Sequence, residues 1–187
     1  MPNADKTLSP HEIKGLSQAE KPSSAYLSHG KAIRVLFVCL GNICRSPLAE
    51  IVVQGQAKKK GVSSQFIFAS AGTGDWHAGG PADARSAQTA IQHGLDLSGH
   101  RAQQITANKV SDWDWFVAMD DDNRINLLAM GVPEERLLMM RQFEASSDIT
   151  LDVPDPYYGG TDGFENAYHM LSDNADHVLD YLVKQGV

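Results

Sequence analysis

The fold of this chain is decided by the stretch Ile33-Arg-Val-Leu-Phe-Val38-Cys39-Leu-Gly-Asn-Ile-Cys-Arg45-Ser46-Pro47. Residues 33–38 are apolar apart from Arg34, which is typical of a strand buried on both faces of a parallel sheet. A tight loop follows over residues 39–45. Ser46 and Pro47 then predict a helix start, with Ser46 as the N-cap and Pro47 at the first helical position. Loops of this kind, at the carboxyl end of a strand, are where open α/β sheets bind ligands.

The remainder of the chain alternates strands and helices in the same way. Three further strands are predicted, over residues 66–71, 113–119 and 137–140. Four helices are predicted, over residues 46–61, 82–93, 122–130 and 164–184. This alternation predicts an α/β fold, a three-layer sandwich with a four-stranded parallel sheet flanked by helices and a phosphate-binding loop after the first strand.

Length and composition predict one soluble globular domain. The chain has 187 residues, of which 42% are hydrophobic and 21% charged, and no window is apolar enough to span a membrane. Residues 1–31 are polar and interrupted by two prolines, so we expect a flexible N-terminal extension with at most a short helix over 10–20. Residues 32–187 form the predicted domain. Because the N-terminus lacks the apolar region of a secretory signal, we expect a cytoplasmic protein.

Charge and cysteine content exclude several classes of protein. The net charge of −7 argues against a nucleic-acid binder, which needs a basic surface to displace counterions. The two cysteines, Cys39 and Cys44, are too few for a disulfide-rich secreted scaffold or a multi-cysteine zinc site. We expect no metal and no cofactor.

The loop after the first strand contains the residue types that hold a tetrahedral anion. Backbone N–H groups at a helix N-terminus attract negative charge, and Gly41 and Asn42 tolerate a left-handed backbone. Arg45 can pair two phosphate oxygens at once. A positive field lowers the pKa of a thiol, so Cys39 would be a nucleophile facing phosphorus. The loop lacks the Gly-Lys-Ser/Thr of nucleotide-binding loops, and the alternative for Cys39 is a small buried apolar residue.

Two motifs resemble those of a known family. Val38-Cys-Leu-Gly-Asn-Ile-Cys-Arg-Ser-Pro47 is similar to the signature of the low-molecular-weight protein tyrosine phosphatases. Asp155-Pro-Tyr-Tyr158, followed by glycines, resembles the second motif of that family. The likeness covers about residues 32–187, which would then be the phosphatase domain. It implies hydrolysis of phosphotyrosine and other aryl phosphate monoesters through a phosphocysteine intermediate.

The resemblance also implies the catalytic roles. Cys39 would attack phosphorus, and Asp155 would protonate the leaving group and then activate water. Arg45 would hold the phosphoryl oxygens together with the loop residues Leu40, Gly41, Asn42, Ile43, Cys44 and Ser46. From its own sequence context Asp155 would be an ordinary turn residue, because Asp beside Pro is common in turns.

Other residues are assigned supporting roles by the resemblance. Trp76 and Tyr157 would form the walls of a slot for a phenyl ring, although Trp76 can also be a loop aromatic that packs on its own loop. His100, together with Asn42 and Ser46, would brace the loop, and Ser46 would donate to the Cys39 sulfur. Asp120 either has a structural role or supports the loop of Asp155.

Cys44 has two compatible interpretations. It is either a small residue that fills a tight loop, or a resolving thiol that captures oxidised Cys39 as a disulfide. A low-pKa thiol beside a second cysteine is typical of redox protection.

Three rival functions can be compared with this prediction. Arsenate reductases share the loop but need further cysteines, which this chain lacks. Phosphoarginine phosphatases of the same family have a small polar residue where Ile43 stands. A non-catalytic phosphotyrosine-binding module would lack the nucleophile, the arginine or the acid. We therefore expect phosphotyrosine-containing proteins as partners, with a tyrosine kinase as a further partner, and a monomer or weak dimer.

Overall fold

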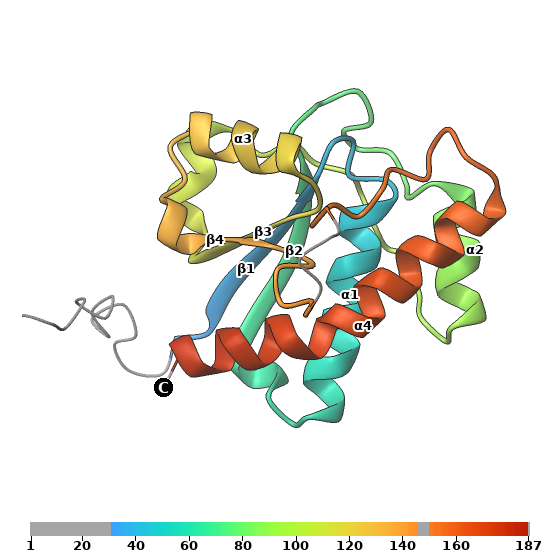
Figure 1. Ribbon diagram of the computed structural model, residues 1–187. Coiled ribbons are helices and arrows are strands. Elements are labelled where there is room, and N and C mark those ends of the chain that lie inside the picture. The colour runs from blue at the N-terminus through green and yellow to red at the C-terminus, as the bar shows by residue number, and fades with distance from the viewer. Residues whose placement is uncertain (1–30, 146–149, 187) are drawn as a thin grey trace, which may run out of the picture.

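A computed structural model describes residues 31–145 and 150–186 of the chain (Figure 1). The short helix expected over 10–20, and the predicted extension apart from Lys31, lie outside the described residues. The strands and helices follow in the order β1 (Ile33–Cys39), α1 (Arg45–Lys59), η2 (Ser63–Gln65), β2 (Phe66–Gly72), α2 (Ala84–Gln92), η3 (Ala107–Asp112), β3 (Trp115–Ala118), α3 (Asp121–Ala129), η4 (Glu134–Arg136), β4 (Leu137–Met139) and α4 (Thr161–Gln185).

The four strands form one parallel sheet in the order β2-β1-β3-β4. Cys39 at the end of β1 pairs with Gly72 at the end of β2, and Val38 pairs with Ala118 at the end of β3. The carboxyl ends of these strands therefore meet at one edge, where an α/β sheet binds its ligands. The predicted four-stranded parallel sheet is confirmed.

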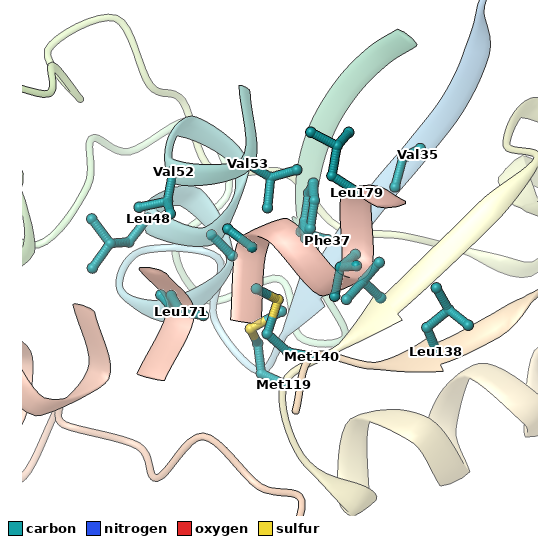
Figure 2. Close-up of a cluster of buried hydrophobic side chains, with 14 of the residues drawn as sticks. Val35, Phe37, Leu48, Val52, Val53, Met119, Leu138, Met140, Leu171 and Leu179 are labelled. Atoms are coloured by element: carbon teal, nitrogen blue, oxygen red, sulfur yellow. The ribbon is translucent and has the colours of Figure 1, made fainter. Parts of the chain in front are cut away.

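Strand β1 lies between β2 and β3 and contributes buried side chains to both faces of the sheet. Val35 and Phe37 belong to a core that includes residues of α1 and α4 (Figure 2). Leu36 and Val38 belong to a second core on the other face, with Leu127 of α3. Because successive side chains of a strand alternate between faces, one apolar run anchors helices on both sides. The predicted three-layer arrangement is confirmed, with α1 and α4 covering one face and α3 the other (Figure 1).

The helix after β1 begins one residue before the predicted N-cap. Helix α1 starts at Arg45 and its N-cap position is Cys44, which makes no side-chain capping bond. The prediction that Ser46 is the N-cap is therefore wrong. Its hydroxyl is turned into the loop, where it contacts Cys39 and Asn42.

The other boundaries differ by a few residues. Asp83 and Asp120 cap α2 and α3 with their carboxylates, so α2 starts two residues later than expected and α3 one residue earlier. Strand β3 covers only Trp115–Ala118 of the predicted 113–119 and follows a 3-10 turn over residues 107–112. Helix α4 begins at Thr161, before the predicted start at Phe164. Among the described residues, no helix has the length and apolarity needed to cross a membrane.

Candidate active site

The loop between β1 and α1 directs its carbonyl groups outward to neighbouring segments. Thr73 N donates to Cys39 O and Gly74 N donates to Leu40 O, both at 2.9 Å. Asp83 N donates to Ile43 O at 2.8 Å, and Ser86 Oγ donates to Cys44 O at 3.1 Å. Since these carbonyls are bonded to neighbouring segments, the loop N–H groups other than that of Asn42, which donates to Cys39 Sγ, can face an anion.

Asn42 shapes the loop with both its backbone and its side chain. Its φ is +56°, a left-handed conformation that asparagine tolerates better than most residues. Its backbone N–H donates to Cys39 Sγ at 3.3 Å. Its side-chain Oδ1 accepts from Gln103 N at 2.8 Å, which leaves Nδ2 to donate to Ser46 Oγ at 2.9 Å. The residue is fully buried, so these bonds are screened from water.

His100 braces the loop from outside. Its Nε2 lies 2.7 Å from Asn42 O, which can only accept, so Nε2 carries the proton. Burial is the largest influence on this imidazole and lowers the pKa of His100 below its usual value. A neutral His100 therefore satisfies the geometry, and the predicted contact between His100 and the loop is present.

Cys39 lies at the bottom of the loop with its sulfur held by two groups. Ser46 Oγ is 3.0 Å from Sγ and Asn42 N is 3.3 Å away. The residue is 2% exposed and, with Cys44, is a free cysteine. The Asn42 N–H, and the Ser46 hydroxyl when it turns to the sulfur, can each donate to a thiolate, as a nucleophile and later a leaving group requires.

Arg45 is buried and is held by three oxygens from two distant segments. Its Nη1 donates to Asp120 Oδ2 at 2.5 Å and to Val153 O at 3.1 Å. Its Nη2 donates to Asp155 Oδ2 at 2.8 Å. Burial alone lowers the pKa of Arg45, but the negative charges of Cys39, Asp155 and Asp120 outweigh it and raise that pKa. The guanidinium is therefore charged and fixed in direction.

Asp120 joins the arginine to the start of α3. Its Oδ2 accepts from Arg45, while its Oδ1 accepts from Asn123 N as the cap of the helix. Asp152 Oδ1 accepts from Asp121 N at the same helix end. Asp120 thus contacts Arg45, and the segment carrying Asp155 is tied to α3 through Asp152.

Asp155 and Tyr157 lie on one turn beside the loop. The Asp155 side chain is 37% exposed, and its Oδ1 accepts from Tyr157 N at 3.1 Å. The second oxygen, Oδ2, is the one that faces Arg45. Because it is partly exposed, this carboxylate can be displaced from Arg45 by an incoming anion.

These residues surround a pocket of about 320 Å³. Its lining consists of Cys39, Leu40, Gly41, Ile43, Cys44, Arg45, Trp76, His77, Asp155, Tyr157 and Tyr158. Exposure rises from 2% at Cys39 to 70% at Trp76 and 95% at Tyr158, so the sulfur lies at the floor and the aromatic rings at the rim. Every residue predicted to be catalytic or to bind substrate lines this pocket, except Asn42 and Ser46, which are fully buried and do not line it.

Trp76 packs on its own loop and also lies in the pocket lining. A side-chain carbon at Gly74 would meet the Trp76 ring at 1.8 Å, so the ring packs on its own loop. The same residue also lines the pocket. Glycine at position 74 is therefore what lets the ring lie across the loop and form a wall.

His77 and Tyr158 line the pocket although sequence reasoning did not select them. His77 contacts the loop closely, because a side-chain carbon at Gly41 would lie 3.0 Å from its Cδ2. Tyr158 packs edge-on against Tyr157 with ring centroids 5.0 Å apart. Each directly follows a selected residue in the sequence, His77 after Trp76 and Tyr158 after Tyr157, and this adjacency was the signal that could have identified them. Among the described residues, no group of three or more metal-ligating side chains could hold a metal ion.

Residues 34–187 match the family described as low molecular weight phosphotyrosine protein phosphatase. A relative from Schizosaccharomyces pombe with that description is 38% identical over 151 residues, which cover 80% of this chain and 96% of the relative. The crystal structure of YfkJ from Bacillus subtilis superposes with a TM-score of 0.78 at 34% identity, covering 86% of this chain and all of that one. A protein tyrosine phosphatase from Entamoeba histolytica, crystallised with Hepes in its active site, gives a TM-score of 0.76 at 33% identity, covering 83% of this chain and all of that one.

Proposed function

The chain belongs to the family of low molecular weight phosphotyrosine protein phosphatases, and we propose that Cys39, Arg45 and Asp155 carry out its reaction in the pocket described above. It is a cysteine-dependent protein-tyrosine phosphatase. The observation that supports these roles most strongly is their convergence. A thiol with two hydrogen-bond donors, a charged guanidinium and a partly exposed carboxylate meet in one pocket.

Binding begins with an exchange of anions on Arg45. The phosphoryl group of the substrate enters the loop and takes the Nη2 that Asp155 holds in the resting structure. Asp120 and Val153 O keep Nη1 in place during this exchange. The loop N–H groups and Arg45 then bind the equatorial oxygens and stabilise them most in the transition state.

The first chemical step transfers the phosphoryl group to sulfur. The Cys39 thiolate forms the S–P bond as the P–O bond to the phenol breaks. Once displaced from Arg45, Asp155 takes up a proton from solvent. It donates this proton to the departing oxygen, whose conjugate acid has a pKa of about 10. The products of this step are tyrosine and a phosphocysteine.

The second step hydrolyses the phosphocysteine. Asp155, now a carboxylate, removes a proton from water, and the water oxygen attacks phosphorus as the S–P bond breaks. Ser46 Oγ, at 3.0 Å from Sγ, donates to the sulfur and stabilises the departing thiolate. Asp155 then releases the proton that it removed from water to solvent, and its carboxylate returns to Nη2 of Arg45 as inorganic phosphate leaves.

Depth and aromatic walls favour phosphotyrosine over phosphoserine. Cys39 is almost fully buried, whereas Trp76 and Tyr158 are mostly exposed at the rim. A phenyl ring carries the phosphate down between the walls, but the single methylene of serine would leave it short of the sulfur. The apolar Ile43 in the lining also favours an aromatic substrate over phosphoarginine.

We propose a cytoplasmic protein whose partners are phosphotyrosine-containing proteins, with a tyrosine kinase among them, and a monomer or weak dimer. Neither a cofactor nor a metal has a step in this reaction, because Arg45 and the loop amides supply the positive charge.

Replacement of Cys39 by serine tests the central assignment. We expect Cys39→Ser to bind vanadate but to hydrolyse neither phosphotyrosine nor phosphoserine peptides, because the alkoxide it needs is not available at neutral pH. The parent protein should hydrolyse the phosphotyrosine peptide only. Steady-state assays and calorimetric binding measure both properties. Activity in Cys39→Ser would refute the nucleophile, and comparable rates on phosphoserine would refute the deep pocket.

A further inference from the structure

Arg85, in the first turn of α2, lies between two aromatic rings from other parts of the chain. Its guanidinium carbon is 4.6 Å from the centroid of Phe164 in α4 and 5.5 Å from that of Tyr157. A guanidinium within about 6 Å of a ring face is attracted to it and also stacks on it. Arg85 therefore connects the pocket wall to α4.

Asp83 fixes this guanidinium in place. Its two carboxylate oxygens accept from Arg85 Nε at 3.0 Å and from Nη2 at 2.9 Å. The backbone N–H of Asp83 donates to Ile43 O of the phosphate loop. Hydrogen bonds from Arg85 are the largest influence on Asp83 and lower the pKa of this carboxyl group. Because its charge is paired, Arg85 is built to hold its neighbours rather than to bind an anion directly.

The two rings differ in how firmly they are held. Phe164 is 1% exposed and packs with Ile43, Cys44 and Ala102 beneath the phosphate loop. Tyr157 is 36% exposed and lines the pocket. The core thus fixes Phe164, so the contact with Arg85 chiefly restrains Tyr157.

We propose that Arg85 is a positioning residue that holds Tyr157 against the pocket and so sets the width of the slot for the aryl group. This role rests on the proposed function, in which Tyr157 is a wall for the phenyl ring. Tyr157 N donates to Asp155 Oδ1, so the same restraint also limits the turn that carries the acid. Arg85 acts on the substrate only through Tyr157.

Binding measurements separate this role from a general structural one. Inorganic phosphate reports on the loop alone, whereas benzylphosphonate reports on the loop and the slot together. We expect Arg85→Met to weaken benzylphosphonate about two- to fivefold, the range of an exposed cation–π contact, and to leave the phosphate affinity unchanged. Equal losses for both ligands, or no loss for either, would overturn the proposal.

Arg124→Met is the matched control. Arg124 is also a helical arginine paired with a nearby aspartate, Asp121, but it lies on α3. Its replacement should leave both affinities unchanged. A parent protein that binds phosphate but is inactive would contradict the proposed function and leave the test of Arg85 intact.

Two further variants keep the test decisive if Arg85→Met loses stability. Arg85→Lys retains a cation without the planar fork, so it should recover part of the benzylphosphonate affinity lost in Arg85→Met. In a Tyr157→Leu background, Arg85→Met should have no further effect, because the ring through which it acts is gone. If the lysine variant behaves like the methionine variant, or if the loss persists without Tyr157, the proposal is wrong.

Discussion

Ser46 carries one hydroxyl hydrogen, and three groups surround its oxygen. Asn42 Nδ2 donates to it, so the hydrogen is left for either Cys39 Sγ at 3.0 Å or Ala71 O at 3.3 Å. When Cys39 is a thiol, its S–H donates to Oγ and the hydroxyl turns to Ala71. When Cys39 is a thiolate, the hydroxyl turns to the sulfur. The hydrogen-bond pattern thus follows the charge on sulfur by rotation of one bond.

Asp155→Asn should slow the reaction according to the leaving group. Asparagine can accept the bond from Tyr157 N but cannot give a proton to a phenolate. We expect kcat to fall about 10²–10⁴-fold for phenyl phosphates, the usual range for general acid catalysis. The loss should shrink along an aryl phosphate series as the leaving group becomes more acidic. A loss that is constant across the series would show that Asp155 is not the proton donor.

Cys44→Ala should make inactivation by peroxide irreversible. Cys39 would oxidise to a sulfenic acid, and the Cys44 thiol would then attack that sulfur, forming a disulfide and releasing water. Burial is the largest cause that raises the pKa of Cys44, so Cys44 stays a thiol at neutral pH, and we expect the Cys39 sulfur to react with peroxide first. Recovery of activity with a thiol reductant measures the outcome. Equal recovery in Cys44→Ala and the parent would leave Cys44 as a packing residue only.

For individual residues of the site, the sequence predicted which side chains lie close together but not which hydrogen bonds join them. Cys39, Arg45 and Asp155 were placed together from two motifs, and the structure brings them to one pocket. The contact between Asp120 and Arg45 could not be predicted, because it joins segments 75 residues apart in the chain. Arg85 was missed for the same reason, since its ring partners come from later segments.

Helix starts are the feature of the elements that local sequence predicted least well. Ser46 has the composition of an N-cap, but the loop needs its hydroxyl at the Cys39 sulfur, so tertiary contacts prevail over the capping preference. Asp83 and Asp120 do cap their helices, and each also pairs with an arginine. Asp120 accepts from Arg45 and Asp83 accepts from Arg85. Their capping role alone gives no sign of the second contact.

Helix α4 is the element whose packing should matter most for stability. Leu171 is fully buried in the core between α4, α1 and the sheet (Figure 2). Leu171→Ala should lower the free energy of unfolding by about 2–5 kcal/mol, because it removes buried methyl groups and leaves a cavity. Urea denaturation measures the change. The exposed Ile125 on α3 is the matched control, and its replacement by alanine should have a much smaller effect.

In the whole molecule, the order and the parallel direction of the strands determine where the site lies. All four strands are parallel, so the loops after β1 and β2, the end of β3 and the segment after β4 reach one edge of the sheet. The alternation of strands and helices was enough to predict this architecture. The identity of the residues that close the pocket depended on motifs as well, because periodicity carries no information on side-chain chemistry.

A variant that begins at Lys31 should retain the full activity of the protein. In the part of the chain that the structure describes, the sheet, the two cores on its faces and the pocket lining lie within residues 33–186. We expect kcat/KM on a phosphotyrosine peptide to stay within about twofold of the parent, with an unchanged Tm. Parallel kinetic and calorimetric measurements on both proteins check this. A large loss of either property would assign residues 1–30 a part in the fold or the site.

The carboxylate that rests on Arg45 has a consequence for the speed of turnover. A bare buried guanidinium would hold inorganic phosphate tightly, and the finished product would block the next substrate. Asp155 is tethered within reach of Nη2, so it acts as an internal competitor present at high effective concentration. We therefore expect the carboxylate to replace each phosphate that loosens, so that product release is an intramolecular displacement. The Asp155 side chain would thus both donate the proton and speed the release of inorganic phosphate.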